Sequence, residues 1–350
     1  MMLWPIAKSY GVEWKAMDIS TCLVCCAGRK FSPEKTGTEM TRPVNQALEF
    51  LLMAAVGAST LGSSVVAVAP PAADTTSRRP RVNVPTKTLG GGQFWGDVRF
   101  FRGWRIQQNV LTRHFRLLDP GNVRRAWGGR EDCEAKLEAV RAQQKMAPMS
   151  GKAVVLLHGI VRTARSMSRL GQQLEEDGCT VVPFEYPSTR VGIEESAEYL
   201  DQVIDGLEGI SEIHFVTHSM GGLVVRAWLK SHHDCRVGRM VMLGVPNLGA
   251  CMADRLKANL IYRVIYGPAG QQLGADPEGL IAALPTPRFE FAVIAGVAEK
   301  PGGYNPLVPG DDDGTVALES TRLPGATDFA SVKGLHSFLM LQPAVIDYTR

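Results

Sequence analysis

The sequence Val216-Thr217-His218-Ser219-Met220-Gly221-Gly222 lies between an apolar run and an amphipathic segment. The apolar run, residues 213–216, is typical of a buried strand, and residues 222–230 have the apolar spacing of a helix. A strand that turns into a helix at small residues is the repeating unit of a parallel α/β sheet. This stretch therefore predicts an α/β fold.

The alternation of strand and helix signals continues on both sides of this stretch. Apolar runs at 153–157, 179–184, 240–245 and 289–295 are typical of parallel strands that helices cover on both faces. Between two of these runs, apolar residues recur at helical spacing: Ala197, Leu200, Val203, Ile204 and Leu207. Repeated units of this kind predict a doubly wound, mostly parallel sheet.

Two segments depart from this alternation. Residues 94–117 carry apolar side chains mostly at even spacing, which predicts a short antiparallel ribbon, and a helix is expected at 131–144. Residues 247–287 combine Gly, Pro and mixed helical signals that do not fit one crossover helix. We therefore expect about 247–287 to be a lid or cap insertion after the sixth strand.

Ser219 occupies the position of a nucleophile on a strand-to-helix turn. Such turns usually read Gly-x-Ser-x-Gly, because small neighbours let the two backbones approach. Here Thr217 replaces the first Gly, and Gly221 occupies the second position. We predict that Ser219 is a nucleophile and that His218 and Gly221 support its turn; a plain strand-helix turn is the alternative.

A serine nucleophile needs a histidine base and a carboxylate that orients this histidine. On folds with such a turn, the chain order is Ser, acid, His. Of the seven histidines, only His336 lies beyond His233, so His336 is the predicted base. The acid is expected on a loop after the strand at 289–295, where Asp311, Asp312 and Asp313 follow one another.

Asp313 is the predicted acid because Gly314 supplies a turn directly after it and Val316 can re-enter apolar packing. Adjacent carboxylates repel, so Asp311 and Asp312 are expected to face solvent. A metal loop and a solvated turn are the alternatives, although the run lacks the spaced oxygen ligands and the terminal Glu of a calcium loop.

Attack on a carbonyl also requires two backbone N–H groups for the oxyanion. One is expected from Met220, the residue after the nucleophile, and the other from the loop after an early strand. Leu157-His158-Gly159-Ile160 occupies this loop. Gly159 permits a turn that points the Ile160 N–H inward, and His158 is expected to orient the loop.

These residues resemble the bacterial lipases and esterases of the α/β-hydrolase superfamily. The resemblance covers roughly residues 152–348 and rests on Leu-His-Gly, Thr-His-Ser-Met-Gly-Gly, Asp-Gly-x-Val, a late His and the Val-Pro-Asn-Leu-Gly turn at 245–249. It implies an α/β-hydrolase fold with a Ser219, Asp313 and His336 triad and with Ile160 and Met220 as oxyanion donors. Substrate preference does not transfer, because the lid and the acyl pocket vary most in this family.

The predicted reaction is hydrolysis of a carboxylic ester, from a lipid or another acyl ester, through an acyl-enzyme. Acyl transfer or thioester hydrolysis on the same triad is an alternative, and a non-catalytic lipid- or partner-binding member of the fold is another. No cofactor or metal is expected, because Cys22, Cys25 and Cys26 have no matching Cys or His cluster at zinc-site spacing. The formal charge of +3 favours no nucleic-acid partner, and the sequence leaves the oligomeric state open.

Residues 51–69 carry no charge over a length close to that of a bilayer span. A secretory signal, an uncleaved anchor and a buried helix are the three interpretations. Because Met40 begins an ordinary n-region, we expect it to be the true start, with 1–39 as a doubtful leader and 40–69 as a signal peptide or anchor. This predicts export or anchoring on the periplasmic or extracellular side, with membrane contact through 51–69; cytoplasmic residence is the alternative.

Residues 70–93 are rich in Pro, Ala, Thr, Ser and Arg, which predicts a flexible linker before an α/β-hydrolase domain at 94–350. Four cysteines lie in this domain and permit disulfides in an oxidising compartment, in any of three pairings: Cys133, Cys179, Cys235 and Cys251.

Overall fold

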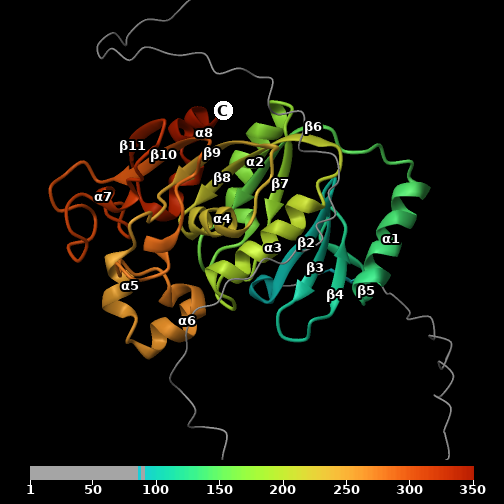
Figure 1. Cartoon of the computed structure of the whole chain (residues 1–350), viewed down its shortest axis with the longest axis horizontal. Helices are drawn as coiled ribbons and strands as arrows, with labels where there is room; N and C mark the ends of the chain where they lie inside the picture. Colours follow the sequence, from blue (N-terminus) through green and yellow to red (C-terminus); the bar gives the residue numbers. More distant parts are fainter. Residues whose placement is uncertain (1–85, 88–90) are drawn as a thin grey trace, which may run out of the picture. The chain divides into compact units, whose positions relative to one another are not determined.

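A computed structural model describes residues 86–87 and 91–350 of the protein, which lie within the unit Ser77–Arg350 (Figure 1). The strands are β1 Thr86–Lys87, β2 Trp95–Phe101, β3 Trp104–Asn109, β4 Phe115–Leu118, β5 Val123–Gly128, β6 Gly151–Leu157, β7 Thr180–Phe184, β8 Ile210–His218, β9 Val237–Leu243, β10 Glu290–Val297 and β11 Asp328–Lys333. The α-helices are α1 Arg130–Gln143, α2 Ser168–Glu176, α3 Ile193–Asp205, α4 Met220–Ser231, α5 Cys251–Leu256, α6 Leu260–Gln271, α7 Leu318–Thr321 and α8 Pro343–Thr349.

Six strands form a parallel sheet in the order β11-β10-β9-β8-β6-β7. The chain runs from β6 to β7 on one side and then returns to β8 on the other side of β6. The connections that follow β6 and β8 therefore diverge, which opens a crevice at the carboxyl ends of these two strands. The prediction of a doubly wound, mostly parallel sheet is confirmed.

Strand β6 shows why the sheet is covered on both faces. Successive side chains of a strand point to opposite faces. Ala153, Val155 and Leu157 belong to one hydrophobic cluster, whereas Val154 and Leu156 belong to another. All five are buried, so the uninterrupted apolar run predicted from the sequence corresponds to two separate cores.

Helices cover both faces of the parallel sheet. The larger cluster includes Leu200 and Val203 of α3 and Leu223 of α4, and these two helices pack against each other. The smaller cluster includes Leu170 of α2 and Ile346 of α8. The helical stripe predicted at 197–207 therefore faces one side of the sheet, and α2 and α8 cover the other side.

A second, antiparallel sheet precedes the parallel one, with strand order β1-β5-β4-β3-β2. It is larger than the short ribbon predicted at 94–117, and α1 buries Cys133, Leu137 and Val140 in the same hydrophobic cluster as its strands. Strand β1 and the 3-10 helix η2 (Gly92–Phe94) lie inside the range predicted as a linker. That linker prediction therefore extends too far toward the C-terminus.

Asp97 joins β2 of the antiparallel sheet to the end of β7. Its N–H donates to the Glu185 carbonyl, and the Glu185 N–H donates to Asp97 Oδ2, each at 2.8 Å. Gln107 Nε2 donates to Asp97 Oδ1 at 2.7 Å. Burial raises the pKa of the Asp97 carboxyl from 3.8 to about 6, although the nearby Arg105 guanidinium opposes this shift.

The raised pKa of Asp97 predicts a pH dependence of stability. Between about pH 4 and pH 6 the folded protein holds a proton that the unfolded chain releases, so the free energy of unfolding falls as the pH rises through this window. Across this window, the Asp97 carboxyl lowers the free energy of unfolding by about 3 kcal/mol. We expect urea unfolding of Asp97→Asn between pH 4 and pH 7 to lack this decline. An identical slope in both proteins would contradict the assignment.

The segment 247–287 contains α5, α6 and the 3-10 helix η4 (Ile281–Ala283), and α6 is kinked at Gly267, before Pro268. It follows β9, which is the fourth strand of the parallel sheet in chain order, and not a sixth strand. Within the described residues β9 is the ninth strand in chain order, because the antiparallel sheet has five strands where the sequence predicted only a short ribbon. Strand β11 was not predicted, because it lies at the sheet edge, has no fully buried residue and therefore lacks an apolar run in the sequence.

The predicted leader and the apolar segment 51–69 lie outside the described residues. Within residues 86–87 and 91–350, every helix is too short or too polar to traverse a bilayer. The four cysteines of this part of the chain are free thiols, and Cys133 is buried.

Candidate active site

Ser219 lies at the sharp turn between β8 and α4. Its backbone has φ 54° and ψ −128°, a conformation that side-chain-bearing residues rarely adopt. Its N–H donates to the Leu243 carbonyl of β9 at 2.9 Å, so the neighbouring strand holds the turn. This strained geometry presents the Ser219 hydroxyl at the carboxyl edge of the sheet.

Two glycines allow the start of α4 to approach its neighbours. A Cβ atom on Gly221 would lie 2.7 Å from the Leu157 carbonyl oxygen and 2.8 Å from that of His158. A Cβ atom on Gly222 would lie 2.5 Å from a methyl group of Val245. Backbone atoms cannot move aside as a flexible side chain can, so Gly221 is the stricter requirement.

We therefore expect Gly221→Ala to lower the free energy of unfolding by about 1–3 kcal/mol, the usual cost of overpacking a filled site. Gly302→Ala is the matched control, because a Cβ atom there would have no neighbour within 4 Å. Urea unfolding of both variants measures the difference. Equal stability of the two variants would show that α4 and the loop after β6 are not in this close contact.

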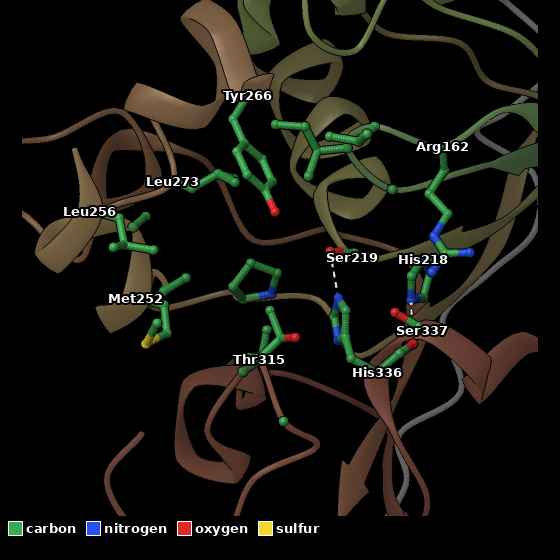
Figure 2. A pocket seen from close by; sticks show the side chains of 18 of the residues that line it. Arg162, His218, Ser219, Met252, Leu256, Tyr266, Leu273, Thr315, His336 and Ser337 are labelled. Atoms are coloured by element: carbon green, nitrogen blue, oxygen red, sulfur yellow. Dashed lines mark hydrogen bonds between the residues drawn. The ribbon is translucent and has the colours of Figure 1, made fainter. Parts of the chain in front are cut away.

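His336 connects Ser219 to Asp313 through its two ring nitrogens. Its Nε2 lies 2.9 Å from Ser219 Oγ (Figure 2), and its Nδ1 lies 2.7 Å from Asp313 Oδ2. The Ser219 and His336 side chains border a pocket, whereas Asp313 is almost fully buried behind the histidine. The structure thus brings together the three side chains that the sequence predicted as nucleophile, base and acid.

The loop after β10 fixes the Asp313 carboxylate. Asp313 Oδ1 accepts hydrogen bonds from the Val316 N–H at 2.8 Å and the Thr315 N–H at 3.1 Å. The His336 N–H in turn donates to the Asp313 carbonyl at 2.8 Å. One carboxylate oxygen is therefore held by the loop, and the other remains for the His336 ring.

The other two aspartates of this run differ from expectation. Asp312 is fully buried, and Asp311 is half-buried. Asp312 Oδ1 accepts the N–H of Gly314, and Asp311 Oδ1 accepts the N–H of Ala298. The prediction that both face solvent was wrong, because backbone N–H groups of the loop compensate the buried charges.

His218 supports the site through the backbone of His336. Its Nε2–H donates to the His336 carbonyl at 2.9 Å, which leaves the fully buried Nδ1 without a hydrogen-bond partner in the described residues. Burial lowers the pKa of His218 well below its usual value, and the nearby His336 and Arg162 act in the same direction. His218 is therefore a neutral donor that positions the base.

The loop after β6 approaches Ser219 closely. A Cβ atom on Gly159 would lie 3.0 Å from Ser219 Cβ, so a side chain at this position would press against the nucleophile. His158 Nδ1–H donates to the Gly159 carbonyl at 2.8 Å, and its ring stacks on Tyr186 with the ring centres 4.3 Å apart. His158 therefore lies where it can orient this loop.

Of the two predicted oxyanion donors, Met220 follows Ser219 in the chain, and Ile160 lines the same pocket as Ser219. Met220 is the first residue of α4, so its N–H has no acceptor inside the helix. Ile160 lines the pocket, and its N–H takes part in no hydrogen bond within the described ranges. Both groups are thus available to an oxygen bound at Ser219.

Ser219 and His336 open into a pocket of about 500 Å³. Its apolar wall comes mostly from the segment 247–287: Met252, Ala253, Leu256, Tyr262, Tyr266 and Leu273. The segment predicted as a lid therefore borders the pocket, and its movement as a lid stays a prediction. In Figure 2, Met252 and Leu256 lie on one side of Ser219, and Arg162 lies on the other.

Sequence reasoning did not single out Arg162, Tyr262 or Tyr266. The spacing of the two tyrosines, four residues apart on α6, was a usable signal for a shared helix face. For Arg162, the one signal in the sequence was its position two residues after Ile160. Within the described ranges, no three His, Cys, Asp or Glu side chains are grouped as a metal site requires.

Comparison with known proteins gives one family match and one curated relative. A family model described as "Domain of unknown function (DUF7379)" matches residues 123–280. A "Lysosomal thioesterase PPT2 homolog" from Drosophila melanogaster is 28% identical over 134 residues, which cover 34% of this chain and 46% of that protein. The chain thus spans about half the length of this relative.

Several solved structures are also similar. The lipase BlEst2 of Bacillus licheniformis in its mature form is 19% identical, with a TM-score of 0.43, over 56% of this chain and 89% of that one. The metagenomic carboxyl esterase MGS0156 is 19% identical, with a TM-score of 0.42, over 54% and 66% of the two chains. The product of gene lin2722 from Listeria innocua is 16% identical, with a TM-score of 0.41, over 57% and 92%.

Proposed function

We propose that this chain, which has the α/β-hydrolase fold, is a serine hydrolase that cleaves carboxylic esters through an acyl-enzyme. The observation that carries this proposal is the continuous hydrogen-bonded series from Ser219 Oγ through the His336 ring to the buried Asp313 carboxylate. A hydroxyl near neutral pH becomes nucleophilic when a correctly oriented base accepts its proton. This arrangement supplies the base and fixes its orientation.

Each residue of the site has a defined task in this reaction. Ser219 Oγ attacks the ester carbonyl carbon while His336 Nε2 accepts the hydroxyl proton. Asp313 holds the proton on His336 Nδ1 and stabilises the imidazolium that forms. His336 then donates the proton to the departing alcohol, and it later activates the water that cleaves the acyl-enzyme.

The oxygen of the carbonyl group becomes negative during attack. The N–H groups of Ile160 and Met220 are the proposed donors to this oxyanion, and loss of one such donor typically costs about 10²–10³ in kcat. The close approach of Gly159 to Ser219 supports this role for the loop after β6.

The pocket wall supports an acyl group as the part of the substrate that binds beside Ser219. Met252, Leu256 and Leu273 present apolar surface on one side of the nucleophile (Figure 2). We propose that an acyl chain, from a lipid or another ester, occupies this side. The segment 247–287, which supplies these residues, is the proposed lid or cap.

Two measurements test the proposal together. The purified protein is expected to react with a serine-directed fluorophosphonate at Ser219 and to hydrolyse p-nitrophenyl esters, tested as a series of increasing acyl length with matched thioesters. Faster cleavage of the thioesters, relative to their uncatalysed hydrolysis, would favour the thioesterase alternative. A folded protein that neither reacts with the probe nor cleaves any member of the series would contradict the proposed function.

A further inference from the structure

Among the described residues that line the Ser219 pocket, Arg162 is the only one with a permanently charged side chain; the others are neutral or are the histidines of the site. No hydrogen bond or ion pair engages its guanidinium within residues 86–87 and 91–350. A half-buried guanidinium without a carboxylate partner has five unused donors beside the nucleophile. Arg162 is therefore a cation on the pocket wall that forms no ion pair with a carboxylate of the described residues.

The backbone of Arg162 is held in place from two sides. Its N–H donates to the Gly159 carbonyl at 3.3 Å, and its carbonyl accepts Gln93 Nε2 at 2.7 Å. Gln93 Oε1 in turn accepts the Thr189 N–H at 3.1 Å. The preceding Val161 has φ 62°, which is a strained conformation for a β-branched residue. The fold thus tolerates strain to hold the Arg162 position next to the proposed oxyanion donor Ile160.

The two ends of the pocket differ in chemistry. The apolar end, with Met252, Leu256 and Leu273, suits the acyl chain, whereas Arg162 lies on the opposite side of Ser219 (Figure 2). The Arg162 side chain lies beside His218 in Figure 2, and it contributes to the lowering of the His218 pKa. An acyl chain in the apolar end directs the leaving group toward the Arg162 side, where His336 Nε2 can protonate it.

We infer that Arg162 determines substrate specificity by binding an anionic group, a phosphate or a carboxylate, on the alcohol portion of the ester. This inference rests on the proposed ester hydrolysis and names its substrate class as anionic esters. A guanidinium pairs with either anion through two parallel hydrogen bonds. The source of the anion is either a lipid headgroup or a soluble phosphorylated or carboxylated alcohol.

The test compares two esters that differ by one charge, 4-(butyryloxy)phenylacetate and its neutral carboxamide. The readout is the ratio of their kcat/KM values, so that the intrinsic reactivity of each ester cancels between protein variants. We expect Arg162→Gln to lower the ratio of anionic to neutral ester by about tenfold, as for loss of a charged hydrogen bond. Arg162→Lys should retain part of the preference, because lysine keeps the positive charge but cannot form the two parallel hydrogen bonds of a guanidinium.

Arg165→Gln is the matched control. Arg165 is exposed, lies three residues further along the chain and does not line the pocket. Its ratio is expected to equal that of the unchanged protein. The preference of the unchanged protein should also weaken between about 0.01 M and about 1 M salt, because the Debye length shrinks from about 30 Å to about 3 Å.

A lipid arm distinguishes the two sources of the anion. Hydrolysis of monomeric dihexanoylphosphatidylglycerol is compared with that of dihexanoylglycerol in the same variants. If Arg162→Gln lowers the preference for the anionic ester more in this lipid pair than in the phenyl ester pair, the anion is a lipid headgroup. If it lowers this preference less, the anion belongs to a soluble alcohol. If both neutral and anionic esters are cleaved and Arg162→Gln leaves both ratios unchanged, the inference is wrong while the proposed function stands. If no ester is cleaved, both fail.

Discussion

Replacing Ser219 by alanine is expected to lower kcat for ester hydrolysis by roughly 10⁴- to 10⁶-fold, because the variant has no hydroxyl to form the acyl-enzyme. The fold should persist, since the substitution removes one oxygen at the wall of an open pocket and leaves the backbone of the turn unchanged. Initial rates with p-nitrophenyl butyrate measure the loss, and thermal unfolding checks that the protein remains folded.

Ser211→Ala is the matched control for this variant. Ser211 lies on the same strand, β8, but is exposed at its far end, where its hydroxyl donates to the Gly151 carbonyl. The kcat of Ser211→Ala is expected to equal that of the unchanged protein.

Because the triad acts as a unit, adding His336→Ala to Ser219→Ala should cost little further activity. Substantial ester hydrolysis by Ser219→Ala would place the nucleophile elsewhere.

Replacing Asp313 by asparagine is expected to lower kcat by about 10⁴-fold. The Asn Oδ1 can still accept the Val316 N–H, which leaves the Nδ2 amino group facing His336 Nδ1. This donor forces the imidazole proton onto Nε2, and His336 can then no longer accept the Ser219 proton. Steady-state kinetics with the same ester measures the effect, and near wild-type kcat would assign the acid to another residue.

The neighbouring Asp312 supplies the contrast. It is equally buried, but its oxygens accept the N–H groups of Asn305 and Gly314 and do not reach His336. Asp312→Asn is therefore expected to lower the unfolding temperature and to retain most of kcat. A loss of kcat as large as that of Asp313→Asn would mean that the loop as a whole, and not one carboxylate, determines activity.

Much of the fold was predictable because its strands have a strong local signal. Each parallel strand from β6 to β10 is an apolar run that is covered on both faces, and each helix face repeats at about 3.6 residues. The exceptions were the segments without such a signal. Strand β11 is only partly buried, and β1 has two residues.

The sequence by itself determined which residues are candidates for the triad. Ser219 stands at a strand-to-helix turn, His336 is the only histidine beyond His233, and Asp313 belongs to a short acidic run between them. These are statements about local pattern and chain order, which need no knowledge of contacts. They left open which of three adjacent carboxylates faces the histidine.

The tertiary structure decided the contacts between residues distant in the chain. Ser219 and His336 are 117 residues apart, and they meet because parallel strands bring their carboxyl ends to one edge of the sheet. The path of the loop after β10 buries Asp312 and aims Asp313 at the ring, and the pocket leaves Arg162 without a partner in the described residues. Such choices depend on the positions of backbone N–H groups and of neighbouring charges in space, which no local pattern of residues contains.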